Sequence, residues 1–438
     1  MTDKTDTQGE TPNTEMGRRG VLKLGGAAAT ASVLAAASAA FPTGAFAAAG
    51  GPEVTGAKLG FIALTDAAPL IVAKELGLFA KYGMPDVVVA KQASWGATRD
   101  NLVLGSGGGG IDGAHILSPM PYLLALGKIG AATPMNILAR LNVNGQGISV
   151  EKGYLANKAD LNAGKMKDVI AKRKAAGREI AMAMTFPGGT HDLWLRYWLA
   201  AAGIDPDKDV KLITIPPPQM VANMKADTME AFCVGEPWND QLVAQGVGYT
   251  AVSTGQLWMN HPEKAFAMRA DWVAAHPKAA VALTAAIIEA QRMCDIPSNN
   301  AKLASIISGP AYLKCPVTDI QDRLAGTFTM GDGRVFRNAP WKMKFWANSA
   351  SFPFKSHDLW FLTEEQRWGK LPMALNKMGV IGKVNRSDIW RQAAALAKVP
   401  GNQIPGGDSR GVERFFDGKV FNPGNPGAYL ASLGIKRV

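Results

Sequence analysis

The chain has 438 residues, 47% hydrophobic and 19% charged, and its 47 Lys and Arg against 36 Asp and Glu give a net charge of +11. This composition excludes a wholly disordered chain, and the length suggests about two to three domains. Three cysteines are too few for a disulfide scaffold. The positive charge leaves three classes of partner open: nucleic acid, an anionic membrane surface and an anionic small ligand.

Residues 1–47 have the layout of an export signal. The pair Arg18-Arg19 precedes an Ala-rich apolar stretch, and an Ala-Phe-Ala cleavage motif ends at Ala47. The arginine pair resembles a twin-arginine signal, which predicts export of a folded chain to the periplasm. A membrane anchor is the alternative, but the apolar stretch is barely long enough to span a bilayer. The charges within residues 1–47 cancel, so the mature chain keeps its +11, and outside the cytoplasm nucleic acid is not an expected partner.

The three cysteines favour no metal site. No Cys and His cluster has the spacing of metal ligands, so we expect neither a metal nor a cofactor. Cys294 and Cys315 could pair and close a loop of about twenty residues. Three free thiols are an equally good interpretation, because a protein that folds before export folds in a reducing compartment.

Strands and helices alternate along the first part of the mature chain. Short apolar runs predict strands at 58–64, 86–90, 111–116, 136–141 and 148–150. Stretches with helical spacing between them predict helices at 68–79, 97–104 and 120–126. This alternation predicts an α/β unit with a mainly parallel sheet covered by helices on both faces.

A second, smaller α/β block follows. It has expected strands at 179–184, 210–215, 231–233 and 250–253, with helices at 165–176, 191–202 and 219–226. After Pro262 the pattern is mostly helical, with helices expected at 270–275 and 278–294. Beyond Gly331 the chain reads as irregular, apart from a helix at 387–397 with Ser387 as its N-cap. No segment after the signal is apolar for long enough to span a membrane.

Two α/β lobes of this kind usually hold a small ligand in the cleft between them. We predict a first lobe built from residues 54–148 and 257–438, and a second lobe from residues 149–256. The sequence has no G-x-S-x-G, S-x-x-K or H-E-x-x-H motif, so a catalytic centre is not expected. The glycine run 105–110 lacks the Gly-Lys-Ser/Thr of a phosphate loop and is interpreted as a connection.

Two glycine-flanked helix starts could bind an anion in that cleft. Trp95 lies in the turn Ser-Trp-Gly at 94–96, and His191 follows Gly-Gly-Thr at 188–190. Free N–H groups and the helix dipole favour anions at such positions. Each residue also has a structural interpretation: Trp95 as a packing residue, Thr190 as an N-cap and His191 as a solvated first-turn residue.

Several segments resemble one family. The sharpest are Ser-Trp-Gly-Ala-Thr-Arg-Asp at 94–100 and Phe-Cys-Val-Gly-Glu-Pro-Trp at 232–238, with further likeness at 60–70, 73–79, 111–121, 261–264 and 269–272. The chain resembles the substrate-binding proteins of nitrate ABC transporters and the related bicarbonate-binding proteins. The resemblance implies a two-lobed, hinged periplasmic binding protein of type II, with α/β lobes whose mixed, mainly parallel sheets carry helices on both faces.

The resemblance also implies a set of ligand-binding residues. In this sequence the set comprises Trp95, Gln146, His191 and Lys264, with Thr190, Glu236 and Pro217 nearby. A nitrate ion has one negative charge and three acceptor oxygens, so its burial needs a positive charge and several donors. The bicarbonate branch is expected to replace the His and Lys with acidic or amide residues and to use a metal. Glu263 adjoins Lys264, so an alignment shifted by one residue would place an acidic residue at this position and would favour bicarbonate over nitrate.

The sequence therefore predicts a soluble, monomeric receptor that binds nitrate, with nitrite as a second ligand, and delivers it to an ABC transporter permease and its ATPase. It is expected to bind no nucleic acid, to insert no segment into the membrane and to catalyse no reaction. Bicarbonate and sulfonate remain alternative ligands. An exported cofactor enzyme and a receptor for a signalling partner remain alternative functions.

Overall fold

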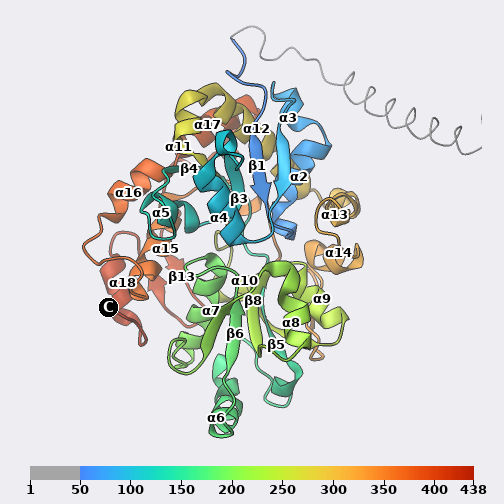
Figure 1. The fold of residues 1–438 in the computed structure, drawn as a ribbon, viewed down its shortest axis with the longest axis vertical. Helices are drawn as coiled ribbons and strands as arrows, with labels where there is room; N and C mark the ends of the chain where they lie inside the picture. Colours follow the sequence, from blue (N-terminus) through green and yellow to red (C-terminus); the bar gives the residue numbers. More distant parts are fainter. Residues whose placement is uncertain (1–49) are drawn as a thin grey trace, which may run out of the picture. The chain divides into compact units, whose positions relative to one another are not determined.

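Two five-stranded sheets organise the described part of the chain, residues 50–438, in this computed structural model (Figure 1). The expected signal peptide and its cleavage site lie outside these residues. The first sheet has the order β2 (Val88–Lys91), β1 (Lys58–Phe61), β3 (Gly113–Leu117), β10 (Lys264–Arg269) and β4 (Met135–Arg140). The second has the order β7 (Lys211–Thr214), β6 (Ala181–Met184), β8 (Ala231–Gly235), β5 (Gln146–Glu151) and β9 (Gly248–Ser253).

Each sheet is mixed, with four strands in one direction and one strand reversed, as expected. In the first sheet β1 runs parallel to β2 and β3, whereas β10 runs antiparallel to β3 and β4. In the second, β6 runs parallel to β7 and β8, whereas β5 runs antiparallel to β8 and β9. The reversed strands are β5 and β10. Each is the first strand that the chain forms after it crosses from the other sheet. The two crossings connect β4 to β5 and β9 to β10.

Helices cover both sheets. Around the first lie α2 (Ala68–Glu75), α3 (Leu78–Lys81), α4 (Trp95–Leu104), α5 (Met120–Ala125), α11 (Ala270–Ala275), α12 (Pro277–Cys294) and α13 (Asn300–Ser308). Around the second lie α6 (Lys167–Ala175), α7 (Thr190–Ala201), α8 (Met220–Lys225), α9 (Trp238–Ala244), α10 (Thr254–Leu257) and α14 (Thr318–Ala325). Nearly every residue of α7 is buried, as its apolar sequence requires. These layers confirm the expected two-lobed α/β fold.

The segment beyond Gly331 is more ordered than expected. It holds α15 (Lys355–Arg367), α16 (Lys377–Val384), α17 (Ser387–Leu396) and α18 (Pro426–Ser432). Two small sheets accompany these helices: β12 (Val335–Phe336) pairs with β11 (Phe328–Thr329), which lies just before Gly331, and β13 (Glu413–Arg414) pairs with β14 (Val420–Phe421). Only α17 was expected, and its N-cap is Arg386, so the assignment of Ser387 as the cap was wrong. Most charged side chains of helix α15 are buried, and Asp358, Glu364 and Arg367 among them form ion pairs.

This C-terminal segment contacts both lobes. Asp358 of α15 forms an ion pair with Arg140 at the end of β4 in the first sheet. Trp360, on the same helix, stacks on Trp194 of α7 in the second lobe, with ring centroids 5.1 Å apart. Helix α15 therefore links the two lobes on one side of the molecule. No helix within residues 50–438 is both long enough and apolar enough to cross a bilayer.

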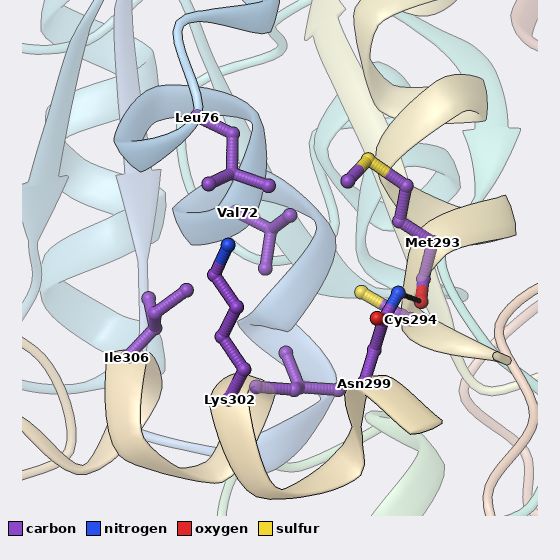
Figure 2. A pocket seen from close by; sticks show the side chains of 8 residues that line it. Val72, Leu76, Met293, Cys294, Asn299, Lys302 and Ile306 are labelled. Carbon is purple, nitrogen blue, oxygen red and sulfur yellow. Dashed lines mark hydrogen bonds between the residues drawn. The ribbon is translucent and has the colours of Figure 1, made fainter. Parts of the chain in front are cut away.

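All three cysteines are free thiols, and Cys294 lines a small apolar pocket between α2, α12 and α13 (Figure 2). The remaining lining residues are Val72, Leu76, Met293, Asn299, Lys302, Leu303 and Ile306. The pocket has a volume of about 40 Å³, which is room for no more than a few waters. The residues expected to bind a ligand lie elsewhere, where the two crossing strands begin.

Candidate functional site

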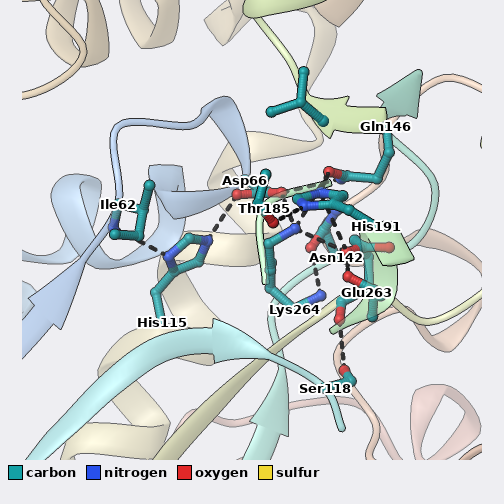
Figure 3. Close-up of polar contacts among 12 residues, drawn as sticks. Ile62, Asp66, His115, Ser118, Asn142, Gln146, Thr185, His191, Glu263 and Lys264 are labelled. Carbon is teal, nitrogen blue, oxygen red and sulfur yellow. Dashed lines mark hydrogen bonds and ion pairs between the residues drawn. The ribbon is translucent and has the colours of Figure 1, made fainter. Parts of the chain in front are cut away.

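The two crossing strands begin with predicted site residues. Gln146 is the first residue of β5 and Lys264 is the first residue of β10. Both side chains point into a buried polar cluster between the sheets (Figure 3). They are joined there by His191, the second residue of α7. None of the three is more than 1% exposed.

Lys264 is the positive charge at the centre of this cluster. Its ammonium Nζ lies 2.9 Å from Asp66 Oδ2, 2.8 Å from Glu263 Oε1 and 3.2 Å from Gln146 Oε1. An ammonium group has three N–H bonds, so these three oxygens use all of them. Burial lowers the pKa of Lys264, but the two carboxylates outweigh burial and raise it. Lys264 is therefore charged at any physiological pH.

Asp66 is held in place from the first sheet. Ile62 donates its backbone N–H to His115 Nδ1 at 3.5 Å, so the His115 proton is on Nε2 and is donated to Asp66 Oδ1 at 2.7 Å. Burial raises the pKa of Asp66, but the charge of Lys264 and the contact with His115 lower it well below its usual range. Asp66 is consequently an ionised carboxylate that shares the cluster with Lys264.

His191 lies on the opposite side of the cluster. Its Nδ1 accepts a hydrogen bond from Thr185 Oγ1 at 2.5 Å, and its Nε2 donates to Gln146 Oε1 at 2.7 Å. Burial and the nearby charge of Lys264 lower the pKa of His191 well below its ordinary value. His191 is therefore a neutral donor, and the Gln146 amide is oriented with its oxygen toward His191 and Lys264.

Glu263 accepts hydrogen bonds from the second lobe. Its Oε1 accepts from Thr190 Oγ1 and its Oε2 accepts from Trp194 Nε1 at 2.7 Å. Burial raises the pKa of Glu263, and Lys264 offsets only part of this increase. Glu263 and Lys264 thus face the same cluster, although one precedes β10 and the other begins it.

Trp95 contributes the remaining predicted contact. It is the first residue of α4, whose N-cap Ser94 accepts a hydrogen bond from the backbone N–H of Ala97 at 3.1 Å. The ring lies under the Lys264 ammonium, with Nζ 5.9 Å from the ring centroid. Its indole N–H is buried and has no hydrogen-bond partner. Such an orphaned donor is rare and is a ready contact for an acceptor atom.

The other predicted residues are less central. Thr190 begins α7 and donates to Glu263, whereas the N-cap of that helix is Gly189. Glu236 directs its carboxylate away, to Arg323 of α14 at 2.6 Å, while its carbonyl accepts from the N–H of Thr65 at 2.8 Å. Pro217 is buried in a short 3-10 helix after β7. It has no hydrogen bond to the cluster within the described part of the chain, residues 50–438.

Several charged and polar members of the cluster were not among the predicted site residues. They are Asp66, His115, Thr185 and Glu263. Asp66 follows the carboxyl end of β1, which is a position where polar residues often face a ligand, so this signal could have been used. Gly235 also faces the cluster, because a Cβ atom on it would lie 2.6 Å from Gln146 Oε1. Within residues 50–438, no group of three or more His, Cys, Asp or Glu side chains is placed to hold a metal ion.

Several known proteins are similar in sequence or in structure to this chain. Residues 50–308 match the model of the NMT1-like family. The nitrate/nitrite binding protein NrtA of Synechocystis sp. is 58% identical over 390 residues, which cover 88% of this chain and 86% of that protein. The crystal structure of the periplasmic nitrate-binding protein NrtA from Synechocystis covers 88% of this chain and 100% of that chain, with a TM-score of 0.86.

Two further relatives are more distant. The bicarbonate-binding protein CmpA of Synechococcus sp. is 45% identical over 396 residues, covering 88% of each chain. The nitrate import ATP-binding protein NrtC of Synechocystis sp. is 34% identical over 390 residues, covering 88% of this chain and 56% of that protein. The chain described here belongs to the NMT1-like family, in the group of substrate-binding proteins that includes NrtA.

Proposed function

We propose that the protein is a periplasmic receptor that binds nitrate, with nitrite as a second ligand, and delivers it to the permease and ATPase of an ABC transporter. The observation that carries the proposal is the convergence of Lys264, His191 and Gln146 on one buried cluster, with the unpartnered indole N–H of Trp95 beside it. The names of NrtA and NrtC support the same ligand and the same kind of transporter. The export signal expected at residues 1–47 supports the location.

The chemistry of the cluster suits a small monoanion. Nitrate offers three acceptor oxygens and no proton, so it needs donors on every side. Lys264 supplies a permanent positive charge, and His191, Gln146 and Trp95 supply neutral N–H donors. The carboxylates of Asp66 and Glu263 disfavour a second negative charge on the ligand. Thr190 acts through Glu263, and we assign Glu236 and Pro217 no direct contact with the ion.

Calorimetry of the mature chain, residues 48–438, tests the proposal. Titration with nitrate should give saturable binding with one site, and nitrite should bind at the same site and displace nitrate. Bicarbonate with and without calcium, and taurine as a sulfonate, complete the panel. An absence of heat and of thermal stabilisation with nitrate, together with binding of bicarbonate in the presence of calcium, would contradict the proposal and favour a ligand like that named for CmpA.

The same preparation tests the remaining parts of the proposal. A single species at the mass of one chain is expected in size-exclusion chromatography with light scattering. Fusion of residues 1–47 to a reporter that folds before export should carry it to the periplasm, and replacement of Arg18-Arg19 by Lys-Lys should block export. No catalytic role is assigned, because the relatives are named as binding and transport proteins.

A further inference from the structure

The donors of the proposed nitrate site are almost all in use. The three N–H bonds of Lys264 are directed to three oxygens, and the Gln146 amide N–H groups donate to Asp66 Oδ2 at 3.0 Å and to the carbonyl of Asn144 at 3.3 Å. His191 donates its one N–H to Gln146. Only Trp95 keeps a free N–H. An anion can therefore be bound by Lys264 and Gln146 only if an acceptor now present gives way.

One acceptor has the position that an anion oxygen would need. Asp66 Oδ2 accepts from Lys264 Nζ at 2.9 Å and from Gln146 Nε2 at 3.0 Å, so a single oxygen bridges two of the expected ligand donors. The two donors come from different sheets, because Lys264 begins β10 and Gln146 begins β5. The carboxylate thus links the two lobes as a bound anion would.

Asp66 is easier to displace than Glu263. Each oxygen of Glu263 is also bonded to the second lobe, through Thr190 and Trp194. Asp66 Oδ1 has its own partner, His115 Nε2, in the first lobe, so Oδ2 is the only oxygen of Asp66 that contacts Lys264 and Gln146. Glu263 would continue to neutralise Lys264 after Oδ2 is displaced.

We propose that Asp66 is an internal placeholder for the anion: its Oδ2 occupies an oxygen position of the ligand in the free protein, and nitrate binds by displacing it from Lys264 and Gln146. This inference rests on the proposed function. It assigns to Asp66 a role in specificity, because an incoming ion must compete with a carboxylate. In the free protein, the same carboxylate joins the two lobes and keeps the buried Lys264 paired. A weakly held or doubly charged ion would fail in that competition.

The test compares nitrate binding to the wild type and to Asp66→Asn by calorimetry. Removal of the competing charge should lower the Kd for nitrate by about tenfold, because the anion no longer displaces charge-assisted hydrogen bonds. A merely structural role of Asp66 predicts the opposite, a weaker site. Asp112→Asn is the matched control: Asp112 is a buried carboxylate of the same lobe that accepts from the backbone N–H of Lys58, and its replacement should leave the Kd unchanged.

A second variant, Asp66→Ser, removes the carboxylate with a smaller side chain and should also tighten binding. An unchanged or higher Kd in both variants would overturn the placeholder role, and so would failure of both variants to fold, since Asp66 would then be a structural partner of Lys264. If the wild type itself does not bind nitrate, the proposed function falls as well. Binding by the wild type without tightening in the variants overturns this inference alone.

Discussion

The two lobes contribute different chemistry to the same cluster. The first lobe supplies the charged groups, Lys264, Asp66 and Glu263, from β10 and the turn after β1. The second supplies neutral groups, among them Gln146 and His191. The charge balance is therefore set within one lobe before any ligand arrives. The other lobe adds shape and donors without altering that balance.

Lys264→Met should have the largest effect, because it removes the only cation found in the cluster as described and leaves two buried carboxylates facing each other. We expect loss of nitrate binding by about 100-fold or more and a loss of about 3 to 5 kcal/mol in unfolding free energy. Calorimetry and urea denaturation measure the two effects. Lys211→Met, at an exposed position on β7, is the control. Near-normal nitrate affinity in Lys264→Met would contradict the assignment of charge to the first lobe.

Glu365 of α15 lies next to the start of α7. It can be used to test whether this part of the second lobe tolerates a negative charge. Its carboxyl group is buried beside Gly188 and has no hydrogen-bond partner, and burial raises its pKa to about 8. The folded state therefore binds more protons than the unfolded state from about pH 4.5 to pH 8, so stability is full below this window and falls as the pH rises through it.

Glu365→Gln should remove that slope and stabilise the protein at pH 8 by roughly 4 kcal/mol, with less than about 1 kcal/mol at pH 5. Thermal unfolding of both proteins from pH 5 to pH 8.5 measures the difference. The same slope in the variant and the wild type would show that Glu365 is not the titrating group.

His191→Gln should weaken nitrate binding by about tenfold, because Gln retains a donor but loses the fixed direction given by Thr185. The neutral state of His191 adds a second expectation: since its pKa is well below its ordinary value, the Kd of the wild type should be flat from pH 6 to pH 8. Binding that weakens steadily over this range in the wild type, and not in His191→Gln, would mean that His191 acts as a cation.

Trp95→Phe should have the smallest effect. The change removes the unpartnered indole N–H and keeps a ring under Lys264, so nitrate should bind about fivefold more weakly. Trp346→Phe, on the C-terminal segment, should leave binding unchanged. An unchanged Kd in Trp95→Phe would assign Trp95 to packing alone.

Features specified by nearby residues were predicted from the sequence. The starts of α4 and α7 follow from Ser94, Gly189 and the polar residues around them, because capping and glycine turns act over a few residues. Helix α11 was predicted with its observed limits. The family resemblance predicted Trp95, Gln146, His191 and Lys264 as ligand-binding residues. The structure places these four residues in or beside one cluster.

Features specified by distant residues were missed. Strand β10 was not predicted, because Lys-Ala-Phe-Ala-Met-Arg is short, has a charge at each end and becomes a strand only between β3 and β4. Helix α15 was missed because polar and charged residues such as Asp358, which pairs with the distant Arg140, are buried in it. The same applies to Asp66, whose partner Lys264 lies 198 residues away in the chain. Such pairs are set by topology rather than by spacing.

A crystal structure of the protein with nitrate is the most direct test of the division of roles between the lobes. This division requires one nitrate ion with an oxygen within hydrogen-bond distance of Lys264 Nζ and other oxygens bound by His191 or Gln146 and by Trp95. A nitrate ion bound away from Lys264, or bound by groups of one lobe only, would contradict it.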